Sequence, residues 1–300
     1  MITKNAMITI CGRPNVGKST LTNCLVGEKI AIVSNKPQTT RNRITAVVEH
    51  GETQFVFMDT PGFHKPRNRL GDYMVGVVRS SVADVDAVLL LVEPVAKMGK
   101  QEEELIKAFA ESGMSVILCI NKIDTVEPSS LLEVMALYAA AYDFKAIIPL
   151  SAKTGEGVDE LLTELEKYAQ DGPALFPEGM VTDQPEKQVV AELIREKLLL
   201  CLDREVPHGT AVEITKFSER DASDGEPVID VDATIYCEKA SHKGIIIGKN
   251  GAMLKKIGAL ARQDIEQFMG TKVFLQTWVK VKENWRDSES LLRNFGFRDD

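Results

Sequence analysis

The sequence has few cysteines, no long hydrophobic run and no overall excess of positive charge. Its five cysteines are scattered, and no two of them have the C-x-x-C spacing used by zinc and redox sites. We therefore expect them to be small buried residues of a protein in a reducing, cytoplasmic compartment. No segment approaches the roughly 18 apolar residues of a transmembrane helix, and the N-terminus lacks the apolar stretch of a secretory signal.

The length and composition are those of an ordinary globular protein. With 300 residues, 44% of them hydrophobic and 27% charged, the chain is long enough for one large domain or two of usual size. The formal net charge is -8 at pH 7. Taken alone, this acidic total argues against a nucleic-acid partner, because proteins that bind phosphate backbones usually carry an excess of Lys and Arg.

Residues 1–170 alternate short apolar runs with helical patterns. The expected strands are 7–11, 55–58, 87–92, 115–120 and 146–150, and the expected helices are 18–26, 101–112, 129–142 and 158–168. Such alternation predicts an α/β domain with a mainly parallel sheet and helices on both faces. Residues 171–185 contain three prolines and predict a linker, although Leu175, Phe176 and Met180 suggest that it packs against something.

Residues 186–300 follow a different pattern. A helix is expected at 186–203, strands near 210–217, 228–237 and 272–282, and further helices near 251–269 and 287–295. Apolar and polar residues alternate in 228–237, which is typical of a half-buried strand. We therefore expect a second domain, of the α+β class, at 186–300.

Residues 12–19 match the phosphate-binding pattern G-x-x-x-x-G-K-[ST]. The motif follows an apolar strand and opens a helix, which is the context it requires. The backbone N–H groups from Asn15 to Ser19 can bind phosphate oxygens, and Lys18 can reach the β- and γ-phosphates. The Ser19 hydroxyl can bind Mg²⁺.

Asp59-Thr60-Pro61-Gly62 follows the next predicted strand. A carboxylate at this position can hold Mg²⁺ through water, and the Gly62 N–H can contact a γ-phosphate. The residue types also suit a plain turn, so the motif takes its meaning from the P-loop that precedes it. The next residue is Phe63, where Ras-like enzymes have a glutamine that orients the attacking water, and slow intrinsic turnover is therefore expected.

Two short motifs predict that the base is guanine. Asn121-Lys122-Ile123-Asp124 follows a predicted strand, at the sheet edge where α/β proteins bind ligands. The Asp124 carboxylate can accept hydrogen bonds from guanine N1–H and its exocyclic amine together, whereas adenine lacks this arrangement. Asn121 can tie loops together, Lys122 can lie against the base, and Ser151-Ala152-Lys153 can add a backbone N–H toward guanine O6.

The polar stretch 36–43 is the expected switch loop, which needs a threonine that reaches Mg²⁺ and the γ-phosphate. Thr40 is the predicted residue, and Thr39 is the alternative. The candidate catalytic groups are thus Lys18, Thr40 and Gly62, and the candidate Mg²⁺ ligands are Ser19, Thr40 and Asp59. The candidate nucleotide-binding residues are Asn15, Val16, Gly17, Lys18, Ser19, Thr20, Asp59, Gly62, Asn121, Lys122, Asp124, Ser151, Ala152 and Lys153.

A second glycine loop lies at 248–251, between an apolar run and a predicted helix. G-x-x-G alone is weak evidence, but its flanks have the form of a K homology (KH) loop, which grips RNA backbones. Residues 239–282 carry nine Lys and Arg against Asp264 and Glu266, a net charge of +7 within an acidic chain. This local stripe predicts an RNA contact despite the global charge. The candidate RNA-binding residues are Ile247, Gly248, Lys249, Asn250, Gly251 and Lys255.

In their order along the chain, these motifs resemble the Era family, Ras-like GTPases of the TrmE–Era–EngA group that carry a C-terminal KH domain. The resemblance covers essentially the whole chain, including the Gln38-Thr39-Thr40-Arg41 switch and the strand at 278–282. It implies a P-loop GTPase domain at 1–170, a linker at 171–185 and a type II KH domain at 186–300. The cofactors implied are GTP or GDP and Mg²⁺, and Asn15 resembles the asparagine that holds K⁺ in potassium-stimulated relatives.

The resemblance also implies a function and partners. The expected protein is a GTP-dependent switch in assembly of the small ribosomal subunit, which binds the 3′ end of small-subunit ribosomal RNA. It is expected to be a cytoplasmic monomer, with peripheral association at the inner face of the cell membrane as a further expectation.

Two other function classes stay open from the residues alone. A P-loop ATPase or metabolic kinase would use the C-terminal part to bind substrate, but the guanine motif argues against it. A protein-interaction module would use the same part for dimerisation or membrane association, and charge reversal at Lys249 and Lys255 separates this alternative from RNA binding.

Overall fold

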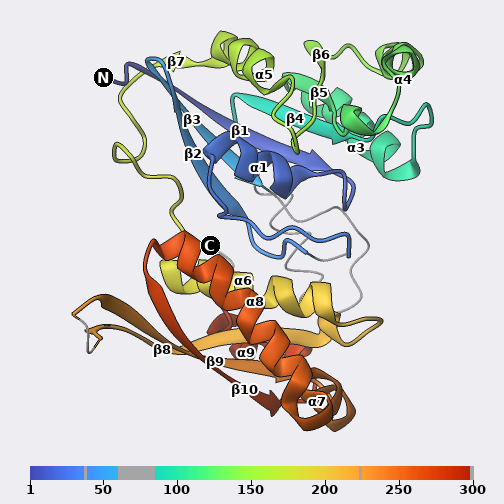
Figure 1. Ribbon diagram of the computed structural model, residues 1–300. Helices are drawn as coiled ribbons and strands as arrows, with labels where there is room; N and C mark the ends of the chain where they lie inside the picture. Colours follow the sequence, from blue (N-terminus) through green and yellow to red (C-terminus); the bar gives the residue numbers. More distant parts are fainter. Residues whose placement is uncertain (37–38, 60–84, 223–224, 298–300) are drawn as a thin grey trace. The chain divides into compact units, whose positions relative to one another are not determined.

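The computed structural model describes residues 1–36, 39–59, 85–222 and 225–297 (Figure 1). The chain forms two compact units. Of the described residues, 1–31, 40–59 and 85–183 belong to the first unit, and 32–36, 39 and 184–297 belong to the second. Within the described residues, no helix is long and apolar enough to cross a membrane.

The described part of the first unit contains a seven-stranded sheet with the path β2-β3-β1-β4-β5-β6, and β7 pairs with β1. The strands are β1 (Lys4–Gly12), β2 (Ile44–His50), β3 (Thr53–Asp59), β4 (Ala87–Val92), β5 (Val116–Ile120), β6 (Ala146–Pro149) and β7 (Gln170–Asp171). All neighbouring pairs from β3 to β6 are parallel, whereas β2 and β7 are antiparallel to their partners. The sheet is therefore mainly parallel, as the sequence predicts.

Helices cover both faces of this sheet. They are α1 (Lys18–Val26), α3 (Lys100–Ser112), α4 (Pro128–Ala141) and α5 (Val158–Leu165). Residues of α1 and α5 share one apolar cluster, and residues of α3 and α4 share another. Consecutive residues of β4 alternate between them, with Leu89 and Leu91 in the first and Leu90 in the second. Because both faces are buried, β4 is apolar throughout.

The parallel strands bring four chemistry-bearing positions to one edge of the sheet. Gly12 ends β1 and Asp59 ends β3, while Glu93 and Asn121 directly follow β4 and β5. The registers pair Ile10 with Asp59 on the neighbouring strand, and β4 with β5 up to their last residues. This is the carboxyl edge, where open α/β sheets bind ligands.

Much of the segment expected as a linker is held along the first unit. The Val47 N–H donates to the Val181 carbonyl at 2.9 Å, and the Thr182 hydroxyl donates to the Thr45 carbonyl at 2.7 Å. The Gln54 side chain accepts hydrogen bonds from two backbone N–H groups of this segment, those of residues 175 and 176. These contacts explain why 171–183 belong to the first unit.

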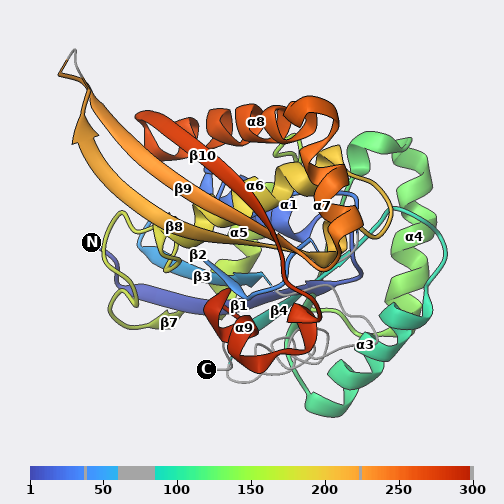
Figure 2. The ribbon, with the colours of Figure 1, turned by 90° about the horizontal axis from the view of Figure 1, so that it is seen from below.

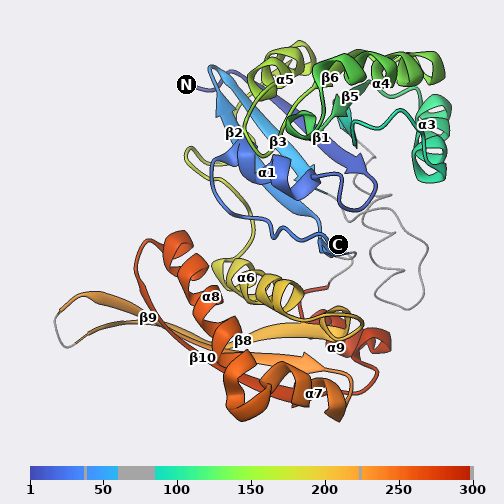
Figure 3. The ribbon, with the colours of Figure 1, turned by 45° about the vertical axis from the view of Figure 1, so that its right-hand side comes forward.

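The second unit packs most of its helices on one face of a three-stranded sheet, which Figure 2 shows from its other face. Its elements are α6 (Glu186–Cys201), β8 (Thr210–Asp221), β9 (Pro227–Cys237), α7 (Ala240–Ile247), α8 (Ala252–Met269), β10 (Lys272–Val281) and α9 (Glu289–Asn294). The strand order is β10-β9-β8, with β8 antiparallel and β10 parallel to β9. Helices α6 and α8 lie against this sheet (Figure 3) and enclose one apolar core with it.

Candidate functional site

The loop between β1 and α1 is folded tightly against Asn121. Gly17 caps α1 with φ of 104°, and a Cβ added there would collide with the Asn121 side-chain amide. Only glycine suits both this backbone conformation and this close approach. Asn121 is 2% exposed, and its Nδ2 donates to the Val16 carbonyl at 2.8 Å. The position of the P-loop is thus fixed by the residue that opens the predicted guanine motif.

Lys18 lies buried inside the P-loop. Its Nζ donates to the Gly12 carbonyl at 3.1 Å and to the Arg13 carbonyl at 3.0 Å. Burial lowers the pKa of Lys18, and the nearby Asp59 carboxylate opposes that effect. Because both hydrogen-bond acceptors of the ammonium group are neutral carbonyls, an anionic phosphate would be a stronger partner for it.

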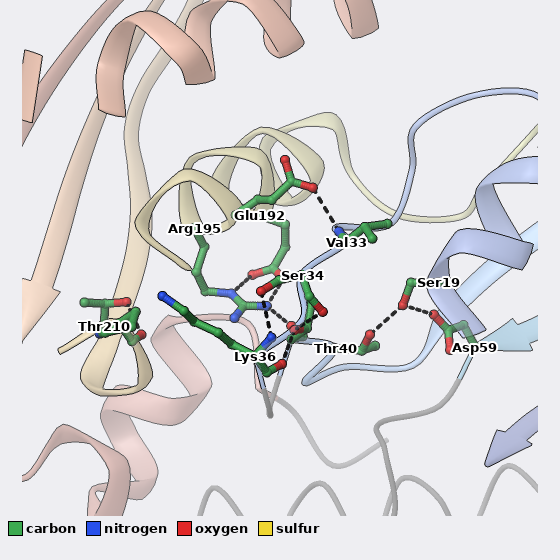
Figure 4. A network of polar contacts seen from close by, with 12 residues as sticks. Ser19, Val33, Ser34, Lys36, Thr40, Asp59, Glu192, Arg195 and Thr210 are labelled. Atoms are coloured by element: carbon green, nitrogen blue, oxygen red, sulfur yellow. Dashed lines mark hydrogen bonds and ion pairs between the residues drawn. The ribbon is translucent and has the colours of Figure 1, made fainter. Parts of the chain in front are cut away.

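Three oxygen-bearing side chains meet next to Lys18 (Figure 4). The Ser19 hydroxyl donates to Asp59 Oδ2 at 2.7 Å, and it shares a 2.8 Å hydrogen bond with the Thr40 hydroxyl. Asp59 is fully buried, and its Oδ1 has no hydrogen-bond partner among the described residues. Burial raises the pKa of Asp59 to about 6, although Lys18 and the Ser19 hydroxyl act against this rise. A buried, partnerless carboxylate oxygen beside two hydroxyls fits a Mg²⁺ ion, which prefers oxygen ligands.

The two switch threonines point to different partners. The Thr40 hydroxyl faces Ser19, whereas the Thr39 hydroxyl donates to the Lys36 carbonyl at 2.6 Å. The Thr39 carbonyl accepts a hydrogen bond from Arg195 of α6. The geometry therefore favours Thr40 over Thr39 as the candidate metal ligand.

The predicted guanine motifs come together as a second cluster. Asp124 Oδ1 accepts a hydrogen bond from the Ser151 hydroxyl at 2.7 Å, and Ser151 is fully buried. The Ala152 N–H donates to Asn121 Oδ1 at 2.9 Å. Lys153 is exposed beside this cluster. Asn121 thus joins the P-loop to the loop after β6, and the Ser151 bond orients the Asp124 carboxylate.

Sequence reasoning missed an ion-pair network beneath this site. Lys122 Nζ lies 2.5 Å from Glu93 Oε1 and donates to the Asn15 carbonyl at 2.7 Å. Glu93 also lies 3.3 Å from Arg13, which pairs with Glu102 of α3 at 2.5 Å. Only its place in the sequence could have indicated Glu93. It directly follows an apolar strand whose carboxyl end lies at the same sheet edge as Asn121.

Some predicted residues add less to this geometry. Val16 is fully buried in the P-loop and Thr20 is half-buried on α1. Gly62 and Phe63 lie outside the described residues. Among the described residues, no group of three or more His, Cys, Asp or Glu gathers as a metal site, so the candidate Mg²⁺ site depends on hydroxyls and one carboxylate.

The G-x-x-G turn of the second unit connects two helices. The preceding apolar run ends helix α7 at Ile247, an element that the sequence did not predict, and α8 begins at Ala252. Gly248 has φ of 72°, and an added Cβ would lie 2.7 Å from the Met253 Cβ. Lys249 and Asn250 are exposed between the two helices. The backbone N–H groups that open α8 are thus presented beside a lysine, as an anion site requires.

A hollow of about 480 Å³ adjoins this turn. Its lining comes from the turn, one side of α8 and strand β10: Gly251, Leu254, Lys255, Gly258, Ala259, Arg262, Leu275 and Thr277. The two acids of the basic stripe are both engaged, since Asp264 pairs with Lys197 and Glu266 accepts the Val273 N–H at 3.2 Å. The lining of the hollow therefore combines apolar side chains with two cations, Lys255 and Arg262, which suits bases and phosphates.

Comparison with known proteins identifies both units. Residues 7–122 match the family model described as 50S ribosome-binding GTPase, and residues 205–286 match the KH domain model. The GTPase Era of Ruminiclostridium cellulolyticum is 51% identical over 295 residues, which cover 98% of each chain. The GTPase Era of Clostridioides difficile is 49% identical over 297 residues, or 99% of each chain.

Two solved structures share the whole fold. A variant of Era from Aquifex aeolicus bound to GDP and AlF4⁻ has a TM-score of 0.92 at 35% identity, covering 98% of this chain and 99% of that chain. An Era complex with MgGDPNP and nucleotides 1506–1542 of 16S ribosomal RNA has a TM-score of 0.91 at 36% identity, with the same coverage.

Proposed function

The chain belongs to the Era family of GTPases, and from this premise we propose that it is a GTP-dependent switch that binds the 3′ end of small-subunit ribosomal RNA. The RNA contact would serve assembly of the small ribosomal subunit. The proposal divides the work between a nucleotide domain at 1–170 and a KH domain at 186–300, joined by 171–185. The observation that carries it is the cationic hollow beside the G-x-x-G turn, in a chain that also has a P-loop.

The nucleotide domain recognises GTP and GDP through the Asp124 cluster. Asp124 accepts hydrogen bonds from N1–H and the exocyclic amine of guanine, while Ser151 keeps its carboxylate oriented. Asn121 holds the two loops that flank the base. A nucleotide without these donors leaves the Asp124 carboxylate unpaired, which is the basis of selectivity.

Hydrolysis proceeds by in-line attack of water on the γ-phosphate. Lys18 exchanges its two carbonyl partners for phosphate oxygens, and the N–H groups from Asn15 to Ser19 bind the remaining charge. Ser19, Thr40 and Asp59 would hold the Mg²⁺, Asp59 through water. When bound, Mg²⁺ would supply positive charge that neutralises the phosphate oxygens. Gly62 N–H is proposed to contact the γ-phosphate.

The proposal includes slow intrinsic turnover, because Phe63 has no group that can orient water. Potassium activation through Asn15 is a further part of it. Hydrolysis that is equally fast in Na⁺ and K⁺ at matched ionic strength would contradict that part.

The KH domain binds RNA through residues 247–251 and Lys255. Lys249 within the turn and Lys255 near the start of α8 are both exposed, where they can contact phosphates while bases enter the hollow. The protein is proposed to act as a monomer in the cytoplasm. Peripheral membrane association is a further prediction, which flotation with lipid vesicles tests.

A binding titration tests the proposal. The probe is a labelled RNA with the last 37 nucleotides of a related bacterium's small-subunit ribosomal RNA. We expect tight binding with a non-hydrolysable GTP analogue and at least about tenfold weaker binding with GDP, a difference of about 1.4 kcal/mol. Equal affinity in both states would refute the switch, and no binding in either state would refute the RNA partner.

A further inference from the structure

One face of β10 carries a row of aromatic and basic side chains that the nucleotide site and the hollow do not use. Every second residue from Lys272 to Lys280 is exposed, and the row reads Lys272, Phe274, Gln276, Trp278 and Lys280. Phe274 is 50% exposed and Trp278 is 44% exposed. The intervening Val273 and Val279 point into the core of the unit. The outer row therefore consists of two aromatics with a lysine at each end and no acid.

The chain covers one end of this sheet face with its own aromatics. Phe295, at the end of α9, lies against Tyr236 of β9, with ring centroids 4.9 Å apart. Phe274 and Trp278 remain largely exposed outside that cluster. Next to Phe274 in the register is Asp230, whose charge is balanced by Lys216 at 3.0 Å and Arg220 at 2.8 Å. Phe274 therefore adjoins an acid whose charge is balanced, and Asp232 adjoins Gln276 further along the row.

RNA is the occupant that fits this row. The RNA in the related complex spans nucleotides 1506–1542, which is 37 nucleotides, whereas a KH loop clamps about four. Strand β10 is an edge strand, and its Leu275 and Thr277 already line the hollow. RNA that leaves the hollow across this edge meets the outer row directly. Exposed aromatics flanked by lysines bind single strands by stacking on bases and by neutralising phosphates.

We propose that the outer face of β10 is a second RNA-binding surface, on which Phe274 and Trp278 stack unpaired bases beyond those held at the G-x-x-G turn. The surface is sequence-tolerant, because every base has a face that can stack. The proposal rests on the proposed RNA-binding function and extends it to a longer stretch of RNA.

Tryptophan fluorescence reports on this surface directly. The chain has two tryptophans, and Trp285 is fully buried whereas Trp278 is 44% exposed. The full-length protein with a GTP analogue is titrated with the 37-nucleotide RNA and with a hexanucleotide from its 3′ end. We expect the long RNA to quench the emission and the hexanucleotide to leave it nearly unchanged, with the quenching lost in Trp278→Phe. Binding of the long RNA, seen by its anisotropy, without quenching would overturn the proposal.

Affinity provides the second test. Phe274→Ser/Trp278→Ser should bind the long RNA at least about tenfold more weakly, with the same salt dependence as the wild type, because stacking releases no counterions. Leu132→Ser, which alters a still more exposed apolar side chain on α4, should bind normally. Unchanged affinity of the double variant would overturn the second surface alone, whereas failure of the wild type to bind would also refute the proposed function. A wild-type dimer that the double variant loses in sedimentation would assign the row to a second copy of the chain instead.

Discussion

Glu93 Oε1 lies 2.5 Å from Lys122 Nζ, and the same carboxylate lies 3.3 Å from Arg13. One acidic residue thus connects the predicted guanine-binding loop with the P-loop. Since Lys122 also donates to the Asn15 carbonyl, the network holds the two loops together.

Replacing Glu93 should weaken nucleotide binding without changing the chemical step. In Glu93→Gln we expect GDP and GTP to dissociate about two- to fivefold faster, because a partly exposed ion pair contributes about 1 kcal/mol or less. Stopped-flow release of labelled nucleotides measures the effect, and single-turnover hydrolysis should keep its rate. Glu103→Gln, on the exposed side of α3, is the matched control. Release that is accelerated for only one of the two nucleotides would contradict this role.

Replacing Asp124 should change which nucleotide is bound. In Asp124→Asn the side chain no longer accepts two hydrogen bonds from guanine, but its amide can donate to the second carbonyl of xanthine. GTP affinity should fall at least about a hundredfold while XTP becomes the preferred substrate. Competition of both nucleotides against a labelled one measures the ratio. Asp159→Asn, exposed at the start of α5, should behave as wild type, and an unchanged preference in Asp124→Asn would contradict the assignment.

The raised pKa of Asp59, about 6, predicts a pH dependence of Mg²⁺ binding. Below that pH the carboxyl is protonated and neutral, so the cation must displace a proton before it binds. The Mg²⁺ concentration for half-maximal hydrolysis should therefore rise about tenfold per pH unit below 6 and level off above 7. Titrations from pH 5 to 8 measure it, with Mg²⁺ binding to free GTP as the correction. A flat profile after this correction would contradict the raised pKa.

The same pKa predicts the sign of a stability change in the metal-free protein. Because the folded-state pKa lies above the ordinary value, the folded state binds more protons than the unfolded state between about pH 4 and 6. The stabilising contribution of Asp59 is thus lost as pH rises through this window. The free energy of unfolding, measured by chemical denaturation without Mg²⁺, should fall accordingly. Asp59→Asn removes this titration and should flatten that part of the profile.

Charge reversal at the G-x-x-G turn should weaken RNA binding electrostatically. Lys249→Glu/Lys255→Glu should lower affinity at least about tenfold at low salt. The slope of log affinity against log salt concentration should become shallower by roughly 0.7 for each phosphate that the variant no longer neutralises. Filter binding from 50 to 300 mM salt measures both quantities. Lys107→Glu, exposed on α3, is the control for a change in net charge. Unchanged RNA affinity would leave the basic stripe without a role in RNA binding.

Local sequence patterns predicted the bounds of those helices and strands whose ends are most clearly marked. The helix Lys18–Val26 and the strand Ala87–Val92 have the expected limits, because glycines flank the former and the latter is buried on both faces. Helix α7 was missed, since Gly244 and the β-branched run at 245–247 disfavour a helix locally and only packing in the second unit stabilises it.

The sequence alone could predict those site residues whose side chains have a single chemical role. Ser19, Asp59 and Asp124 stand in motifs whose spacing reflects a phosphate, a metal ion and a base. The hydrogen bonds that hold the site together were not predictable, because they join residues up to 107 positions apart, as from Lys122 to Asn15. The exposed row on β10 became visible only once the register showed which side chains share the outer face.

Crosslinking to total cellular RNA tests the central claim most directly. The protein is irradiated with cellular RNA in the presence of a GTP analogue or GDP, and the crosslinked sites are sequenced. We expect enrichment at the 3′ terminus of small-subunit ribosomal RNA with the analogue and loss of that enrichment with GDP. Enrichment elsewhere, or equal enrichment in both nucleotide states, would contradict it.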